Sequence, residues 1–454
     1  MRSIFLAGLA AAALASAAQA AEDPHVRALS AGYKAAFLCS GIFNAGRPEA
    51  EIAADDLEGI YPDYQALVRS LPAVVDREAK TVSVAFDPKL PPRIAAWRPF
   101  LGCAQLPIGA SADGVAKLPS LEQEGRILVA PGVRKAWPDG DEGATGKTPR
   151  ALNPLLTKAF TDYGGKTTAV VVVKDGRIVG EQYRPGYDLH TPQRTWSAAK
   201  SLTATVVGRA VQLGKVKVEA PANIPEWRAP GDPRAAITLA QLMHMGSGLW
   251  TDGPGNRTDE VYLGGGAVTE WATRMPLEVA PDSRFNYANN DTLLAARAVR
   301  ASLGDGQEAL AFPFTELLWR IGMTHTTPET DWQGNYILSS QVWTTARDLA
   351  RLGLLYLNDG VWNGERLLPE GWSKFVATPA PAQPERNTGY GAFFWLYGPA
   401  QGLPEGTYAM NGNRGQYVFI VPSTKVVIVR RGFDSAQARF DEARFAKDVL
   451  AALE

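Results

Sequence analysis

The stretch spanning residues 168–183 constrains the fold of this chain more than any other. A β-branched run at 168–173 is followed by a turn that contains Asp175-Gly176, and then by a second run at 178–183. Asp-Gly between two such runs is typical of a β-hairpin, because both residues accept the positive φ that a tight turn needs. The chain is therefore expected to contain an antiparallel sheet in which this hairpin supplies two strands.

Helix and strand patterns around the hairpin complete the predicted layout. The pattern predicts four helices and two late strands: helices at 152–163, 197–213, 347–357 and 436–453, and strands at 416–420 and 425–431. The region 215–345 mixes short helices with Gly- and Pro-rich loops. This order predicts an α+β (α/β sandwich) fold, in which helices flank the antiparallel sheet and form a helical subdomain.

The first twenty residues differ in character from the rest of the chain. Arg2 supplies a positive end, residues 4–15 are apolar, and Ala18-Gln19-Ala20 has the small-x-small pattern of a signal-peptidase site. The apolar run is too short and too rich in alanine to span a bilayer. Residues 1–20 are therefore interpreted as a cleavable signal peptide, with a buried Ala-rich helix as the alternative. A periplasmic or secreted location is expected, without a stable membrane span after signal removal.

Residues 21–145 are predicted to form an N-terminal domain of unknown function, and residues 146–454 a larger domain. A polar, Gly-rich segment at 137–143 is interpreted as the linker. The N-terminal domain holds the two cysteines, Cys39 and Cys103, and an even pair in an oxidising compartment favours a disulfide. This disulfide would close a loop of about 64 residues and contribute about 4 kcal/mol in the chain-entropy model. Two buried free thiols are the alternative.

Composition excludes several classes of function. The chain has 46 Lys and Arg against 47 Asp and Glu, a formal net charge of -1, so neither a nucleic-acid surface nor a polybasic membrane anchor is expected. It has only four histidines and no H-E-x-x-H pair, so we expect no metal and no cofactor. The absence of G-x-S-x-G argues against the nucleophile elbow of the α/β-hydrolases.

The best catalytic candidate is the S-x-x-K motif formed by Ser197 and Lys200 at the start of a predicted helix. Three residues are nearly one helical turn, so the two side chains share a face. A serine hydroxyl needs a nearby base, and lysine can be this base only when neutral, a state that burial favours. The N–H groups at the start of the helix favour a developing oxyanion. A helix cap with an exposed lysine is the alternative, although the largely apolar residues 202–207 suit a buried helix.

Two further motifs follow along the chain. Tyr287-Ala288-Asn289 lies about 90 residues after the serine. Its phenol can relay a proton, and its amide can bind a substrate carbonyl. Residues 410–417 lead directly into a late strand, and the glycines there allow the backbone to approach a ligand closely. Taken alone, each of these two motifs is also typical of an ordinary polar turn.

The order and spacing of the three motifs resemble those of the serine β-lactamase and penicillin-binding-protein superfamily. Three other phrases are similar to patterns of that family: QLMHMGSGL at 241–249, TARDLARLG at 345–353 and DGVWNG at 359–364. The resemblance covers roughly residues 150–454, so the N-terminal domain lies outside it. It is greatest to the branch that holds 6-aminohexanoate-dimer hydrolase, family VIII-type esterases and class C-like β-lactamases.

The resemblance implies a β-lactamase/transpeptidase-like fold and a Ser-Lys-Tyr catalytic set. Ser197 becomes the acylated nucleophile, Lys200 the base for acylation, and Tyr287 the proton relay to the leaving group and later from water. The implied oxyanion hole consists of the backbone N–H groups of Ser197 and of Asn413, the residue after Gly412.

Two positions near the implied site differ in how well they fit the family. Asn289 matches, and the resemblance implies that it orients the substrate or the lysine base. The third motif departs from the family, because the position usually taken by Lys or His is Met410. The cation that meets a substrate carboxylate is therefore missing there, although Arg414 lies nearby. This departure predicts weak or no turnover of β-lactams.

The sequence thus predicts an exported serine hydrolase that forms an acyl-enzyme on Ser197. The expected partner is a small-molecule amide or ester, with esterase activity or amidase activity of the 6-aminohexanoate-oligomer type. A D,D-peptidase or β-lactamase is the alternative, and a non-catalytic cell-wall ligand-binding protein that kept the fold is a second one. The presence of Ser197, Lys200 and Tyr287 argues against the binding protein, which has no need of all three.

Overall fold

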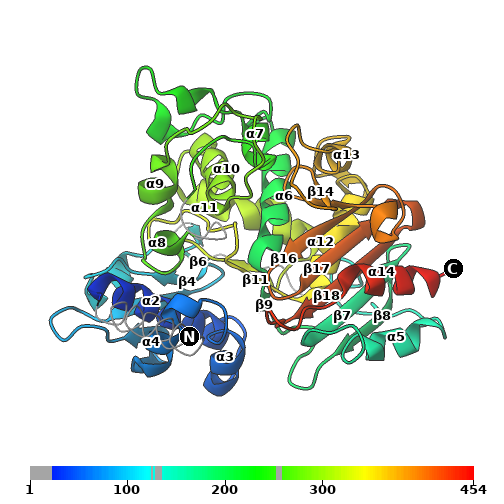
Figure 1. Cartoon of the computed structure of the whole chain (residues 1–454), viewed down its shortest axis with the longest axis horizontal. Helices are drawn as coiled ribbons and strands as arrows, with labels where there is room; N and C mark the ends of the chain where they lie inside the picture. The colour runs from blue at the N-terminus through cyan, green and yellow to red at the C-terminus, as the bar shows by residue number, and fades with distance from the viewer. Residues whose placement is uncertain (1–22, 124–125, 128–134, 252–257) are drawn as a thin grey trace, which may run out of the picture.

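The computed structural model describes residues 23–123, 126–127, 135–251 and 258–454. It shows three parts: an N-terminal unit in blue and cyan, a helical region mostly in green, and a large sheet that combines early and late strands (Figure 1). The central helix α6 (Ala199–Gln212) lies between the helical region and the sheet. The predicted signal peptide, residues 1–20, lies outside the described residues.

The large sheet has seven antiparallel strands in the order β14-β15-β16-β17-β18-β7-β8. The predicted hairpin forms β7 and β8, and its turn residues Asp175 and Gly176 both have positive φ. The C-terminal strands join the hairpin through the β18–β7 pair, so early and late parts of the chain share one sheet. The strands are β7 (Thr167–Lys174), β8 (Arg177–Tyr183), β14 (Gly389–Tyr390), β15 (Trp395–Tyr397), β16 (Thr407–Gly412), β17 (Gln416–Val421) and β18 (Val426–Gly432).

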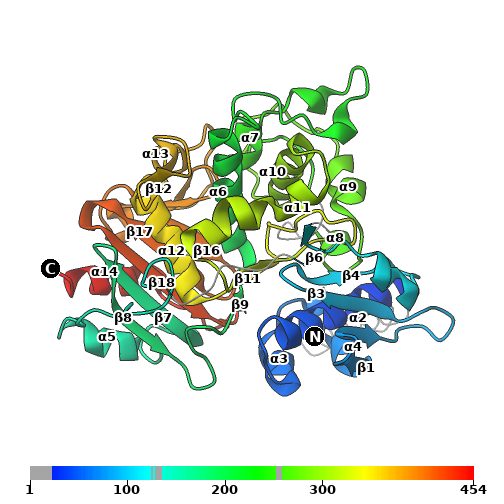
Figure 2. The same cartoon turned by 180° about the vertical axis from the view of Figure 1, so that it is seen from behind.

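Helices cover both faces of this sheet and build the helical region. They are α5 (Leu152–Lys158), α7 (Leu239–Met243), α8 (Asp259–Tyr262), α9 (Val268–Trp271), α10 (Asn289–Ser302), α11 (Gln307–Pro313), α12 (Ala346–Leu357), α13 (Trp372–Val376) and α14 (Glu442–Ala451). Figures 1 and 2 show α5 and α14 on one side of the sheet and α12 on the other. The predicted α+β fold with an antiparallel sheet flanked by helices is confirmed.

Alternation along β7 explains why its sequence is apolar throughout. Val170 and Val172 pack in the cluster with α5 and α14, whereas Val171 and Val173 pack in the cluster on the opposite face. Successive side chains of a strand point to opposite faces, and here both faces are covered. The whole β-branched run is therefore buried, which is the physical reason for the pattern that predicts it.

The last helix is shorter than predicted. α14 begins at Glu442 instead of at residue 436, and α5 is also shorter than its predicted span. Before α14, the Asp434 carboxylate accepts a hydrogen bond from the backbone N–H of Phe440 at 3.0 Å. Asp441 then caps the helix by accepting from a backbone N–H in its first turn. These carboxylates hold the preceding segment in a non-helical loop, which the apolar periodicity alone does not reveal.

The N-terminal unit is a helix packed on a small antiparallel sheet. The disulfide predicted for Cys39 and Cys103 is present and joins α2 to β4, with 6.2 Å between the two Cα atoms. The elements are α2 (Pro24–Phe43), α3 (Glu49–Asp55), α4 (Gln65–Ser70), β1 (Ala73–Asp76), β2 (Thr81–Val84), β3 (Arg93–Arg98) and β4 (Gly102–Gln105).

Buried polar contacts fasten the N-terminal unit to the rest of the chain. Glu329 accepts hydrogen bonds from Ser40 Oγ at 2.7 Å, Asn44 Nδ2 at 2.8 Å and the backbone N–H of Cys103 at 3.0 Å. Arg93 is buried and donates to the carbonyl oxygen of Leu263 at 3.1 Å. Breaking such contacts would leave buried polar groups unpaired, so the unit is held in one position.

The segment 137–143, predicted as a linker, packs against α12. The Asp141 carboxylate accepts from Arg351 Nη2 at 2.8 Å and from Arg347 Nη1 at 3.2 Å. The guanidinium of Arg351 also lies 4.7 Å from the ring centre of Trp137. The segment therefore has ordered contacts of its own with the larger unit.

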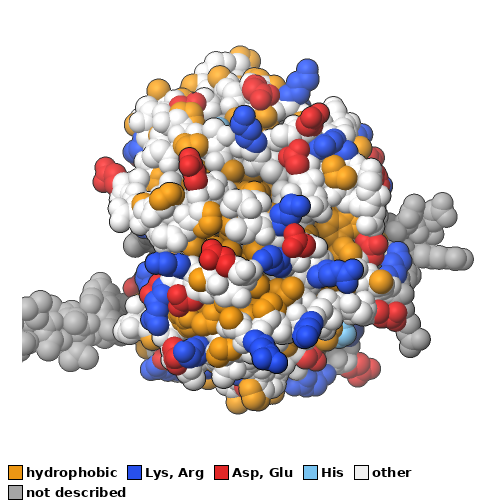
Figure 3. All heavy atoms as spheres, turned by 90° about the vertical axis from the view of Figure 1, so that its right-hand side faces the viewer, with side chains coloured by type: hydrophobic (Ala, Val, Ile, Leu, Met, Phe, Trp, Pro, Cys, Tyr) orange, Lys and Arg blue, Asp and Glu red, His pale blue; other side chains and the backbone are white. Residues whose placement is uncertain are grey.

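Two surface properties agree with the composition. None of the described helices combines the length and the apolar character that crossing a membrane requires. Figure 3 shows Lys and Arg side chains intermixed with Asp and Glu over the face at the right of Figure 1. Interspersed charges of both signs are expected for a chain with a net charge of -1.

The disulfide should contribute measurably to stability. Replacing both Cys39 and Cys103 by alanine is expected to lower the free energy of unfolding by about 2–4 kcal/mol, because the long closed loop gains freedom in the unfolded chain. Urea unfolding followed by circular dichroism measures this loss. Reductant should weaken the wild-type protein by a similar amount and leave the double variant unchanged. Two free thiols in the unfolded, unreduced wild-type protein would contradict the bond.

Candidate active site

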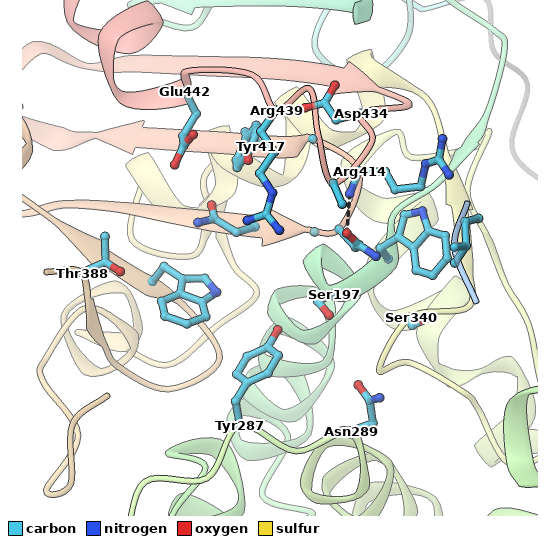
Figure 4. Close-up of a pocket in the computed structure, with 18 of the residues that line it drawn as sticks. Ser197, Tyr287, Asn289, Ser340, Thr388, Arg414, Tyr417, Asp434, Arg439 and Glu442 are labelled. Atoms are coloured by element: carbon cyan, nitrogen blue, oxygen red, sulfur yellow. Dashed lines mark hydrogen bonds between the residues drawn. The ribbon is translucent and has the colours of Figure 1, made fainter. Parts of the chain in front are cut away.

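Ser197 lies in a short turn, Trp196–Ala198, that leads directly into α6. Trp196 has a φ of 50°, a conformation that is unfavourable for a bulky residue. Its ring contacts Phe37 of α2, with 6.0 Å between ring centres, and the Arg194 guanidinium lies against both rings, 3.9 Å from the centre of Trp196 and 4.4 Å from that of Phe37. This packing holds the strained residue in place, and Figure 4 shows the Ser197 hydroxyl directed into a pocket.

Lys200 is buried one helical turn after the serine. Its Nζ lies 3.3 Å from Ser197 Oγ, 2.7 Å from Asn289 Oδ1 and 2.9 Å from the carbonyl oxygen of Ser339. Burial lowers the pKa of Lys200 to about 7, and the charge of Asp291 opposes this shift. A substantial fraction of the lysine is therefore neutral near pH 7, as a base for the serine hydroxyl must be.

Tyr287 lies close to both Ser197 and Lys200, in the loop before α10. Its ring centre is 5.1 Å from Lys200 Nζ, and it packs against Tyr390 and Trp395 with 5.9 and 5.4 Å between ring centres. Burial raises the pKa of Tyr287 to about 12, and a hydrogen bond with Ser197 opposes this shift. The phenol therefore stays protonated near neutral pH and can donate its proton.

Asp291 is a buried acid of the site that the sequence reasoning missed. It lies in the first turn of α10, and its Oδ1 accepts a hydrogen bond from Ser247 Oγ at 2.8 Å. Burial raises the pKa of Asp291 to about 7, and its negative charge raises the pKa of Lys200. Its position two residues after Asn289 was visible, but nothing in the pattern showed that it faces the lysine.

The hairpin between β16 and β17 brings the third motif to Ser197. Gly412 ends β16, and residues 413–415 form the connecting loop. A Cβ atom on Gly412 would lie 2.1 Å from the carbonyl oxygen of Thr195 and 3.1 Å from the nitrogen of Ala198. Only glycine permits this approach. The backbone beside it therefore lies against the turn that carries Ser197, where an oxyanion hole of N–H groups is predicted.

These groups converge on a cavity of about 710 Å³. Figure 4 shows Ser197, Tyr287 and Asn289 around its floor, and Gly412 and Asn413 also line it. The five residues come from the turn before α6, from the end of the loop before α10 and the first residue of α10, and from the β16–β17 hairpin. A cavity with aromatic walls and a few convergent polar groups is the usual form of a small-molecule site.

Two arginines near the cavity have different roles. Arg414, the cation beside the third motif, donates to the carbonyl oxygens of Glu58 and Phe433, both at 3.1 Å, and so braces the structure. Arg439 comes from the loop before α14, and Figure 4 shows its guanidinium directed into the pocket. It forms no ion pair with any other described residue. The sequence reasoning missed Arg439 because it assigned this segment to a helix.

One group among the described residues has the donor types of a metal site. Ligand atoms of Asp141, His190 and His325 lie within 4.8 Å of one another. The two histidine rings stack with 4.6 Å between centres, and Asp141 Oδ2 lies 3.1 Å from His190 Nε2. Arg347 and Arg351 already occupy the other oxygen of this carboxylate. The group lies outside the cavity lining and is accounted for as a hydrogen-bonded cluster that anchors the segment 137–143.

Comparison with known proteins places this geometry in context. The family model described as Beta-lactamase matches residues 152–450. The chain is 25% identical over 291 residues to 6-aminohexanoate-dimer hydrolase of Paenarthrobacter ureafaciens, which covers 58% of this chain and 72% of that protein.

Solved structures share the fold. A Bacillus anthracis protein proposed to be a 6-aminohexanoate-dimer hydrolase matches with a TM-score of 0.55 and 22% identity, over 66% of this chain and 81% of that one. A class C β-lactamase matches with a TM-score of 0.52 and 17% identity, over 67% of this chain and 96% of that one. The family match includes all the motif residues that line the cavity. The chain therefore belongs to the Beta-lactamase family, as its three motifs predict.

Proposed function

We propose that this member of the family forms an acyl-enzyme on Ser197 and hydrolyses a short amide or ester. One observation carries the proposal: Lys200 Nζ lies 3.3 Å from Ser197 Oγ in a buried environment that lowers the pKa of the lysine to about 7. A serine with a neutral base at this distance is an activated nucleophile. Membership of the family supports a hydrolase, and the site supports the acyl-transfer route.

The acylation step follows from the arrangement of the side chains. Neutral Lys200 accepts the proton of Ser197 Oγ as this oxygen bonds to the substrate carbonyl carbon. The backbone N–H groups of Ser197 and Asn413 stabilise the oxyanion that forms. Tyr287 then donates its proton to the leaving nitrogen or oxygen as that bond breaks. The phenolate regains a proton from the Lys200 ammonium, which restores both groups.

Water completes the cycle through the same groups in reverse roles. A water molecule that replaces the leaving group gives a proton to the Tyr287–Lys200 pair and attacks the acyl carbon. The ester bond to Ser197 Oγ then breaks, and the proton returns to this oxygen. Asn289, whose amide oxygen lies 2.7 Å from Lys200 Nζ, holds the lysine in reach throughout.

The substrate class is proposed from the cavity and from the relative. The Paenarthrobacter ureafaciens protein is named a 6-aminohexanoate-dimer hydrolase, and the aromatic walls here suit a short chain with apolar parts. We therefore favour an esterase or linear amidase. Retention of a buried Lys200 argues against a non-catalytic binding protein, because burying an amine costs stability that ligand binding alone does not require.

A D,D-peptidase or β-lactamase is the second candidate, and one specific observation favours it. Arg439 directs an unpaired guanidinium into the cavity, where it can meet a substrate carboxylate. This cation comes from the loop before α14 and not from the position of Met410, where relatives usually carry Lys or His. We still prefer an esterase or linear amidase, because the third motif itself carries no cation at Met410.

The location and the domain division are part of the proposal. Residues 1–20 act as a cleaved signal, and the protein works in the periplasm or outside the cell. The Cys39–Cys103 disulfide supports this, because such bonds persist in oxidising compartments. We propose residues 21–145 as one domain and residues 146–454 as the hydrolase domain.

Labelling tests the nucleophile directly. A fluorophosphonate should add once to the wild-type protein, and both the adduct and the turnover of p-nitrophenyl butyrate should disappear in Ser197→Ala. We expect kcat/KM to fall by at least about 10³-fold, as for other covalent catalysts that lose their nucleophile. Intact mass and absorbance measure the two effects. Ser435→Ala, which alters an exposed serine of the same cavity, is the matched control. A folded wild-type protein without an adduct would contradict the proposal.

The rate should depend on pH through the lysine. Because neutral Lys200 is the active form and its pKa is about 7, kcat/KM for p-nitrophenyl butyrate should rise through about pH 7 and level off above it. Asp291→Asn removes a charge that raises this pKa, so the rising limb should move to lower pH. Asp305→Asn, which alters an exposed acid, is the control and should not shift the pH of the rising limb. If the rising part of the kcat/KM–pH profile moves to higher pH in Asp291→Asn, Lys200 is not the group that titrates there.

β-Lactam turnover separates the two candidates. With Met410 where a cation usually stands, kcat/KM for nitrocefin should be at least about 100-fold below that for p-nitrophenyl butyrate, since an unmet carboxylate loses a charge-assisted contact. Parallel steady-state assays on one preparation measure the ratio. Nitrocefin hydrolysis at an ordinary enzymatic rate would favour the second candidate and point to Arg439 as the replacement cation.

A further inference from the structure

The N-terminal unit supplies one wall of the cavity that holds the nucleophile. Gly59, Ile60 and Tyr61 line the same cavity as Ser197. They belong to a part of the chain that precedes the family match at 152–450. Part of this pocket is therefore lined by residues that precede the family match.

The wall is a defined loop that its own unit holds in place. The backbone N–H of Gly59 donates to Gln65 Oε1 at 2.7 Å. The Tyr61 ring is buried and packs edge-on against Tyr33 of α2, with 4.9 Å between ring centres. Tyr33 in turn donates its hydroxyl proton to the carbonyl oxygen of Asp56 at 2.7 Å. The loop 58–61 is thus fixed against α2 before it meets the cavity.

The same loop is tied to the proposed catalytic backbone. Arg414, next to Asn413 in the β16–β17 hairpin, donates to the carbonyl oxygen of Glu58 at 3.1 Å. Trp196, the residue before Ser197, packs against Phe37 of α2. These two contacts set the distance between the N-terminal wall and the reacting groups.

The geometry also decides which part of a substrate meets this wall. Tyr287, the proposed proton donor to the leaving group, lies on the Thr388 side of Ser197 (Figure 4). Arg414, which binds the loop 58–61, lies on the opposite side. A leaving group beside Tyr287 therefore departs toward Thr388. The acyl group extends the other way, toward the loop.

We propose that the loop 58–61 is the end wall of the acyl pocket and that Ile60 limits the length of the acyl chain. This rests on the proposed acyl-enzyme function. Ile60 is half-buried and faces the cavity, and the neighbouring Tyr61 ring is buried. The wall is therefore apolar, and packed side chains support it. Such a wall selects a short aliphatic or aromatic acyl group, since one methylene more than an apolar wall accommodates costs about tenfold in kcat/KM.

The test varies the acyl chain while the leaving group stays constant. We would measure kcat/KM for p-nitrophenyl esters from acetyl to octanoyl with the full-length mature protein. Ile60→Ala should move the optimum toward longer acyl chains and raise kcat/KM about tenfold for esters beyond the wild-type optimum. Ile60→Trp should move the optimum toward shorter chains. In a second series with a constant butyryl group, the ranking of different alcohol leaving groups should not change.

Ile108→Ala is the matched control, because Ile108 is an exposed isoleucine of the same unit that does not line the cavity. Its acyl-length profile should match that of the wild type. If Ile60→Ala and the wild type show the same dependence of kcat/KM on acyl chain length, Ile60 does not limit that length. This outcome rejects the proposal even if Ile60→Trp does not fold. Fluorophosphonate labelling in each preparation separates the two proposals, since absence of the Ser197 adduct in the wild type rejects the acyl-enzyme itself.

Discussion

The burial of Lys200 is the constraint on which the rest of the site depends. An ammonium group removed from water is unstable unless it loses its proton or finds partners, and this one does both in part. Its nitrogen contacts Ser197, Asn289 and the carbonyl oxygen of Ser339, while burial lowers its pKa to about 7. α6, α10 and the loop before β11 (Val342–Thr344) must therefore meet at one point, and the cavity forms where they meet.

Packing around this point sustains conformations that would otherwise be unfavourable. Trp196 keeps a positive φ because its ring packs against Phe37 and against the Arg194 guanidinium, which lies on both rings. Gly412 allows the β16–β17 hairpin to approach the turn that carries Ser197. Strain and close approach of this kind are typical of functional sites, where the surrounding structure determines the geometry. The N-terminal unit takes part in it, since Phe37 belongs to α2.

Sequence reasoning predicted the fold and named motif residues that the structure brings together at one cavity, but it did not predict several long-range contacts. The resemblance located the motifs, and the cysteine pair predicted the disulfide that is present. Arg414 was the cation considered for substrate, yet it braces Glu58. Asp291 was missed because a position on a helix does not reveal which residue the side chain will meet. Arg439 was missed because Asp434 and Asp441 hold its segment in a loop, where the pattern predicted a helix.

By itself the sequence determined what depends on near neighbours: the β7–β8 hairpin through its Asp-Gly turn, and the shared face of Ser197 and Lys200 through their spacing on a helix. Only the tertiary structure decided that the lysine is buried, which side chains meet it and that Gly59, Ile60 and Tyr61 of the N-terminal unit line the same cavity as Ser197. The physical reason is that burial, and with it the pKa, arises from groups far apart along the chain. No local pattern specifies those contacts until the sheet and helices have packed.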